Sequence, residues 1–135
     1  MPQQIMRSSA TLVEEARRDI EELTAKEAIE LAKNPDVVLV DIRDPRELER
    51  EGKIPGAFHA TRGMLEFWVD PDSPYFKPIF GQDKKFVFFC AGGMRSVLAT
   101  KAVQDMGLKP VAHIIGGFKA WKEAGGPVDR DEPKG

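Results

Sequence analysis

The sequence has little cysteine or histidine, no long apolar run and no excess of one charge. A single Cys among 135 residues excludes an internal disulfide, and two His residues are too few for a zinc site unless carboxylates complete it. The 20 basic and 22 acidic residues nearly cancel, and no basic stripe is present, so nucleic acid is not an expected partner. No stretch is apolar for long enough to span a bilayer or to act as a signal peptide, so no membrane partner is expected. The free thiol and the missing export signal together favour the reducing cytoplasm as the location.

The length and composition that remain are those of one globular domain. Hydrophobic residues make up 41% of the chain and charged residues 31%, which is enough apolar material for a single core. We expect three segments: a helical N-terminal extension over residues 1–19, the domain itself over residues 20–128, and a polar, frayed tail over residues 129–135.

Apolar runs alternate with helical patterns along the chain. Strands are expected at residues 20–23, 37–42, 86–90 and 111–115, with a brief fifth strand after "IPGA". Helix starts are expected at a capping box of Thr11 with Glu14, a capping box of Thr24 with Glu27, Asp44 followed by Pro45, Ser96 and Gly116-Gly117. Residues 70–82 contain several prolines and are expected to form an irregular loop.

This βα alternation predicts a mainly parallel sheet with helices on both faces. Ligands of such folds bind beyond the carboxyl ends of the strands. Two of the expected strand ends carry reactive side chains, Asp41 in "VLVDIR" and Cys90 in "VFFCAGG". The sequence therefore predicts a site where these two strands end.

The cysteine loop has the composition of an anion site. Cys90 ends an apolar strand, and Gly92 and Gly93 in the following turn allow several backbone N–H groups to converge on one point. The helix start behind the turn and the positive charge of Arg95 also favour an anion. We therefore predict that Cys90 is a thiolate at neutral pH. The alternative, an inert buried cysteine, explains neither the paired glycines nor the arginine.

The spacing between the cysteine and the arginine selects the chemistry. Protein-tyrosine phosphatases place five residues between the two, and the resulting loop wraps around a phosphate. Here four residues separate Cys90 from Arg95, and Ser96 stands where the phosphatase arginine would be. The smaller cradle favours one additional sulfur atom on the cysteine, a persulfide, over a bound phosphate.

Three stretches together resemble the single-domain rhodaneses, the thiosulfate and thiol sulfurtransferase family. The stretches are "VVLVDIRDPRELEREGKIPGAFHA", "FVFFCAGGMRS" and "KPVAHIIGGFKAWKEAGGPV". The resemblance covers residues 20–128, which would make that segment a rhodanese-like domain. It implies an α/β, rhodanese-like fold with a central, mostly parallel five-stranded sheet and helices on both faces. It also implies that no metal or organic cofactor is used.

The resemblance implies a role for each residue of the loop. Cys90 would be the catalytic persulfide carrier, and the persulfide- and anion-binding loop would consist of Ala91, Gly92, Gly93, Met94, Arg95 and Ser96. Cys90 would take a sulfane sulfur from a small anionic donor, thiosulfate or a persulfide, and pass it to a thiol or cyanide acceptor, or to an acceptor protein. Two positions depart from many relatives: Ala91 replaces an arginine, and Lys53 replaces a histidine.

The supporting residues are Asp41, Arg43 and Glu47. Asp41 is expected to accept hydrogen bonds from turn backbone near the site, and Arg43 and Glu47 are expected to form an i,i+4 ion pair. Ser96 is expected to cap its helix, to donate its hydroxyl toward Cys90, or both. His59 and His113 are expected to be buried and hydrogen-bonded. A group of aromatic residues is expected either to line the mouth of the site or to form a docking surface: Phe67, Trp68, Tyr75 and Phe76.

Two other functions are compatible with the sequence. The first is a persulfide-binding relay module that carries sulfur for a partner protein with little turnover of free thiosulfate, and Ala91 favours it. The second is a phosphatase-like or arsenate-reducing enzyme of the same fold, which the four-residue spacing disfavours.

Overall fold

The β-branched and aromatic runs of the sequence form one five-stranded sheet in the computed structural model, which describes residues 2–130. The strand order is β1-β5-β4-β2-β3, and every neighbouring pair is parallel. The α/β fold with a five-stranded sheet is confirmed, and the sheet is parallel throughout rather than mostly parallel. The strands are β1 (Glu21–Leu23), β2 (Val37–Asp41), β3 (Phe58–His59), β4 (Lys85–Phe89) and β5 (Val111–Ile114).

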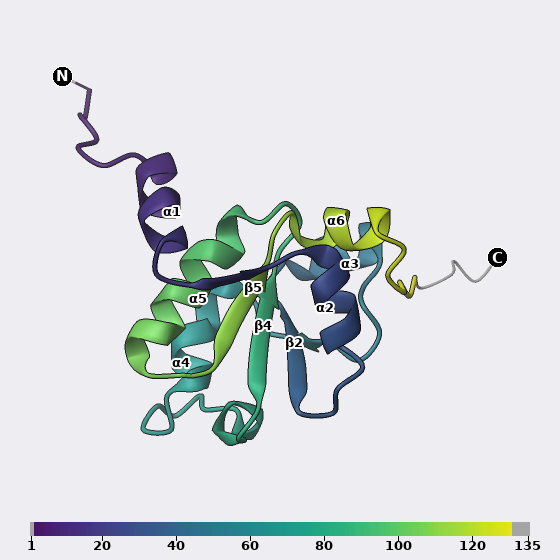
Figure 1. Ribbon diagram of the computed structural model, residues 1–135. Coiled ribbons are helices and arrows are strands. Elements are labelled where there is room, and N and C mark those ends of the chain that lie inside the picture. The colour runs from purple at the N-terminus through teal and green to yellow at the C-terminus, as the bar shows by residue number, and fades with distance from the viewer. Residues whose placement is uncertain (1, 131–135) are drawn as a thin grey trace.

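Helices cover both faces of the sheet because parallel strands are joined by crossover connections (Figure 1). One face carries α1, α4 and α5, and the other carries α2, α3 and α6 (Figure 1). The α-helices are α1 (Ser9–Arg17), α2 (Ala25–Leu31), α3 (Pro45–Glu51), α4 (Leu65–Val69), α5 (Met94–Met106) and α6 (Gly117–Glu123), with short 3₁₀ turns at Arg62–Met64 and Pro78–Gly81.

Three of the α-helices, α1, α2 and α3, begin at a residue whose side chain caps the helix. The capping box of Thr24 with Glu27 is present, and Asp44 caps α3. The capping box expected at Thr11 is wrong, because Ser8 accepts a hydrogen bond from the Thr11 N–H and the helix begins earlier.

The start of α5 also differs from the prediction. The helix begins at Met94, two residues before Ser96, and its N-cap is Gly93 in the left-handed conformation, at φ 109°. The turn between β4 and α5 therefore consists of residues 90–93, and the left-handed Gly93 ends it directly before the helix. Ser96 therefore lies in the first turn and is not the cap.

The first residue of the predicted tail, Asp129, is bound to the rest of the domain. Lys53 and Asp129 form an isolated antiparallel bridge, with N···O distances of 2.8 and 2.7 Å. The expectation that the tail is frayed is therefore wrong for residue 129. Residues 131–135 of the predicted tail lie outside the described residues. No helix between residues 2 and 130 combines the length and the apolar character needed to cross a membrane.

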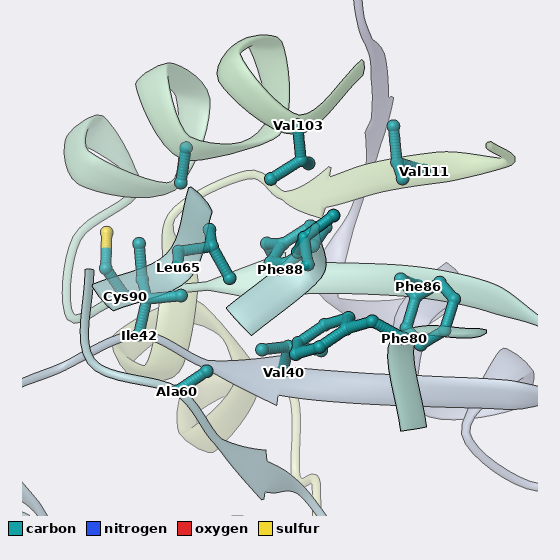
Figure 2. Packing of buried hydrophobic residues seen from close by; sticks show 12 residues of the cluster. Val40, Ile42, Ala60, Leu65, Phe80, Phe86, Phe88, Cys90, Val103 and Val111 are labelled. Atoms are coloured by element: carbon teal, nitrogen blue, oxygen red, sulfur yellow. The ribbon is translucent and has the colours of Figure 1, made fainter. Parts of the chain in front are cut away.

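The strand alternation sends consecutive side chains of β4 into two separate cores. Phe86, Phe88 and Cys90 pack on the face covered by α4 and α5, whereas Val87 and Phe89 pack on the face covered by α2 and α6. Figure 2 shows Cys90 at the end of the row begun by Phe86 and Phe88, with its sulfur near the start of the covering helix. The pleat of β4 therefore decides that the thiol faces the first turn of α5.

Candidate active site

Cys90 lies immediately after β4, at the carboxyl edge of the sheet, and its side chain is buried. The backbone N–H of Gly93 donates to its Sγ at 3.1 Å. The positive φ of Gly93 turns this N–H toward the sulfur, and a Cβ there would lie 3.1 Å from the backbone N of Gly116. The first N–H groups of α5 have no partner within the helix, so the positive end of the 13-residue helix lies beside the sulfur.

A second strand-to-helix turn holds the cysteine loop in place. The N–H of Phe118 donates to the carbonyl oxygen of Cys90 at 2.7 Å, and the N–H of Lys119 donates to that of Ala91 at 3.1 Å. These contacts require a very close approach at Gly117, where a Cβ would lie 2.3 Å from the Cys90 carbonyl oxygen. The start of α6 therefore fixes the backbone of the loop from outside.

The guanidinium of Arg95 forms an ion pair with Glu47 instead of being an isolated charge beside the Cys90 sulfur. Its guanidinium makes two hydrogen bonds of 2.9 Å to the carboxylate of Glu47, which is oriented by a 2.9 Å bond from the Asp44 N–H. The Arg95 hydrogen bonds, against an opposing effect of burial, lower the pKa of Glu47 to about 2. Glu47 in turn is the main cause of the raised pKa of Arg95, with a further contribution from the charge of Cys90. The charge of Arg95 is therefore shared with a permanent carboxylate.

The predicted ion pair between Arg43 and Glu47 is wrong, because Arg43 turns into the protein and pairs with Asp41. Both side chains are buried, the Nη2–Oδ2 distance is 2.7 Å, and the backbone N–H of Arg43 also donates to Asp41. The guanidinium donates to the carbonyl of Gly52 and lies 4.1 Å from the ring centroid of Phe118. This pair connects the end of β2 with α3 and α6 beside the cysteine loop.

Ser96 brings a histidine to the cysteine. The buried Ser96 Oγ lies 3.7 Å from the Cys90 Sγ, 3.1 Å from Nδ1 of His113 and 3.2 Å from the Gly93 carbonyl oxygen, and its single proton can be donated to either of the last two. Nε2 of His113 lies 2.8 Å from a carboxylate oxygen of Glu22. Burial lowers the pKa of His113, and the hydrogen bond and charge of Glu22 offset only part of that effect.

His113 is buried and hydrogen-bonded, as predicted, but its place beside the cysteine was not predicted. β5 pairs with β4, and His113 lies in register with Phe88, two residues before Cys90, a register that the sequence alone does not give. The other histidine, His59, lies against the carbonyl of Arg43 at 2.6 Å.

Two hollows flank the loop. The larger, of about 480 Å³, is bordered by Ala91 and Phe118 together with charged side chains of α3 and α6. The smaller, of about 140 Å³, is bordered by Gly92, Gly93 and His113. Neither is lined by the aromatic group of the 67–76 segment, in which Trp68 and Phe76 pack against the core while Phe67 and Tyr75 are exposed.

Comparison with known proteins agrees with this architecture. The Rhodanese-like domain family matches residues 24–124. The thiosulfate sulfurtransferase GlpE of Coxiella burnetii is 30% identical over 96 residues, which cover 71% of this chain and 81% of that protein.

Two solved structures are similar to this protein over more than nine-tenths of its length. The polysulfide-sulfur transferase homodimer of Wolinella succinogenes is 31% identical with a TM-score of 0.69, over 91% of this chain and 88% of that one. RPA3614 of Rhodopseudomonas palustris CGA009, described as a protein of unknown function and possible tyrosine phosphatase, is 66% identical with a TM-score of 0.93, over 96% and 99% of the two chains.

A parallel α/β sheet with a cysteine loop at its carboxyl edge defines the class. The chain belongs to the rhodanese-like domain family, as the resemblance predicted, and relatives in that family are named as sulfurtransferases.

Proposed function

We propose that this protein transfers a sulfane sulfur through a persulfide on Cys90. The observation that carries the proposal is the 3.1 Å hydrogen bond from the Gly93 N–H to the Cys90 sulfur, at the positive end of α5. Donors in this position stabilise a negative charge on sulfur, whether it is carried by the thiolate or by the outer atom of a persulfide. The sulfurtransferase names of relatives support the same chemistry.

The proposed reaction has two displacement steps. In the first, the Cys90 thiolate attacks the outer sulfur of thiosulfate or of a persulfide, and the bond to the departing sulfite or thiolate breaks. In the second, cyanide or a thiolate attacks the outer sulfur of the Cys90 persulfide, and the Cys90 thiolate leaves. Each step moves one electron pair, and no external oxidant or reductant is required.

The larger hollow is the proposed entrance for the anionic donor. The small side chain of Ala91 lines it, and Arg50, Lys119 and Lys122 border it beside three glutamates. Cations at the rim of a hollow favour the approach of a small anion, although the glutamates reduce the net positive charge.

Mass spectrometry tests the proposal directly. After incubation with thiosulfate or with a low-molecular-weight persulfide, the intact protein should gain one sulfur atom, and cyanide should remove it as thiocyanate. The Cys90→Ser variant should show neither change. A wild-type protein that gains no sulfur from either donor would contradict the proposal.

A relay module is a second candidate, favoured by Ala91 in place of an arginine. It would form the Cys90 persulfide but release sulfite from thiosulfate and cyanide only negligibly in steady state. The description of RPA3614 makes a phosphatase the third candidate. Hydrolysis of p-nitrophenyl phosphate that is lost in Cys90→Ser would favour it over sulfur transfer.

A further inference from the structure

The side chains behind Cys90 form a continuous polar chain that leads away from the substrate hollow. It runs from the Cys90 Sγ to the Ser96 Oγ at 3.7 Å, then to the His113 Nδ1 at 3.1 Å. From the His113 Nε2 it continues to Glu22 at 2.8 Å, and Glu22 is bound by Nε of Arg17 at 3.0 Å. Ser96 and His113 are buried, whereas Glu22 is partly exposed, so the chain connects the sulfur with solvent.

The protonation pattern of this chain follows from its partners. The Glu22 carboxylate accepts a hydrogen bond, so Nε2 of His113 carries the proton and Nδ1 presents its lone pair to the Ser96 hydroxyl. Burial alone would raise the pKa of Glu22, but the hydrogen bonds from His113 and Arg17 lower it overall. A neutral imidazole backed by a charged carboxylate is arranged to accept one proton at Nδ1.

Arg95 does not supply a free counter-charge for the sulfur of Cys90, because Glu47 neutralises it. Both terminal nitrogens of Arg95 that face Glu47 are bonded to that carboxylate, so the pair as a whole is neutral. Because a charge at a buried site is costly without a counter-charge, a thiolate at this position requires a cation close by. His113 is the ionisable group that Ser96 connects to it.

We propose that His113, oriented by Glu22, accepts the Cys90 proton through Ser96 and holds it as the counter-charge of the thiolate. The S–H proton passes to the Ser96 Oγ while the Ser96 hydroxyl proton passes to the His113 Nδ1. The products are a thiolate, an unchanged serine hydroxyl and an imidazolium paired with Glu22. No electron is gained or lost, and the net charge of the group does not change.

The relay lies partly outside the segment shared with the family. The family match begins at residue 24, whereas Glu22 belongs to β1 and Arg17 to α1. Two ionisable groups act on the pKa of His113: Glu22 from β1 raises it, and the charge of Arg17 from α1 lowers it. Cys90 is connected to His113 only through the neutral Ser96 of α5. The proposal gives the N-terminal segment a part in tuning the thiol. It identifies His113 and Glu22 as positioning residues.

The pH profile of Cys90 alkylation tests the relay. Cys90 is the only cysteine, so iodoacetamide consumption or mass gain reports on it alone. The His113→Asn variant keeps a polar group but cannot be protonated, and its profile should shift upward by about one pH unit, a roughly tenfold slower reaction below the midpoint. Glu22→Gln should shift the profile in the same direction by less. Glu21→Gln, the matched control on the same strand, removes a carboxylate that pairs with Lys85 and should change nothing.

A wild-type measurement avoids any dependence on variants that fold poorly. Nitrogen-15 spectra of the His113 ring should show the proton on Nε2 at neutral pH, and alkylation of Cys90 should change the titration of that ring. A neutral ring with its single proton on Nδ1 instead of Nε2, or profiles of folded His113→Asn and Glu22→Gln that superimpose on the wild type, would overturn the relay. The proposal rests on Cys90 as the nucleophile, but alkylation uses no sulfur donor. Absence of sulfur transfer and absence of the relay are therefore separate outcomes.

Discussion

At the scale of single residues, Ala91 separates this loop from those of many relatives. Its methyl group borders the larger hollow, and its carbonyl is held by Lys119, so the position is fixed but carries no charge. An arginine here would add a donor and a positive charge at the entrance without disturbing the bonds that hold the loop.

We predict that Ala91→Arg increases turnover of thiosulfate with cyanide. The KM for thiosulfate should fall about fivefold to tenfold, because hydrogen bonds to a charged partner strengthen anion binding. Steady-state thiocyanate formation measures the effect, and Ala91→Gln controls for side-chain size. An equal gain in both variants would show that charge is not the missing feature.

At the scale of elements, the loop is held between the starts of two helices. The start of α5 supplies the N–H that binds sulfur, and the start of α6 supplies the N–H groups that bind the carbonyls of Cys90 and Ala91. Both arrangements require glycine, since a positive φ and a close backbone approach occur together at Gly93 and Gly117.

Gly117→Ala should destabilise the protein by about 3 kcal/mol or more, since strain and a backbone clash add. Gly125 is the matched control: it also has a positive φ, 87°, but a Cβ there meets nothing within 4 Å. Gly125→Ala should therefore cost only about 1–2 kcal/mol. Urea unfolding measures both, and equal losses would mean that the approach to the Cys90 carbonyl contributes nothing.

The ion pair of Glu47 in α3 with Arg95 in α5 should make the free energy of unfolding depend on pH. The pKa of Glu47 falls from the usual 4.5 to about 2 in the folded state, mainly through its hydrogen bonds with Arg95. A lowered pKa makes the contribution of Glu47 complete above the unfolded value of 4.5, and the contribution is lost as the pH falls toward 2.

The free energies of unfolding of wild type and Glu47→Gln should therefore differ most near neutral pH and converge in acid. Urea unfolding at a series of pH values measures the difference. Glu49→Gln, which changes an exposed carboxylate of the same helix, should give a constant offset. A difference for Glu47→Gln that does not change with pH would contradict the assignment.

At the scale of the whole molecule, the buried pair of Arg43 and Asp41 connects the sheet to the site. The guanidinium reaches the end of β2, the carbonyl of Gly52 after α3, and the ring of Phe118 in α6. Since α6 also fixes the cysteine loop through the Phe118 N–H, the pair couples the stability of the fold to the shape of the site.

Arg43→Met should cost about 3–5 kcal/mol, because it leaves the Asp41 carboxylate buried without its partner. The double variant Asp41→Leu/Arg43→Met should recover part of that loss, since no uncompensated charge remains. Urea unfolding of both single variants and the double variant gives the coupling. Strict additivity of the two single losses would argue against a dependent pair.

The local features of this protein could be predicted from its sequence. The apolar runs, the Thr24 and Asp44 caps and the glycine bend after Cys90 each depend on neighbours within a few residues, which is the range over which propensity and capping act. The fold class followed from their order, and the cysteine loop was predicted at a strand end. Two pairings could not be predicted because the partners are distant in the chain: Arg95 with Glu47, and His113 with Ser96. The pairing of Arg43 with Asp41, two residues apart, depends instead on the burial of both side chains, which the fold decides.

The sequence by itself determined that one thiol would stand after a buried strand, with glycines and an arginine beside it. Only the tertiary structure decided which charges surround that thiol, because the parallel sheet brings the ends of β2, β4 and β5 to one edge. Arg95, for example, pairs with Glu47, which lies 48 positions away in the sequence, because the fold brings α3 beside the start of α5.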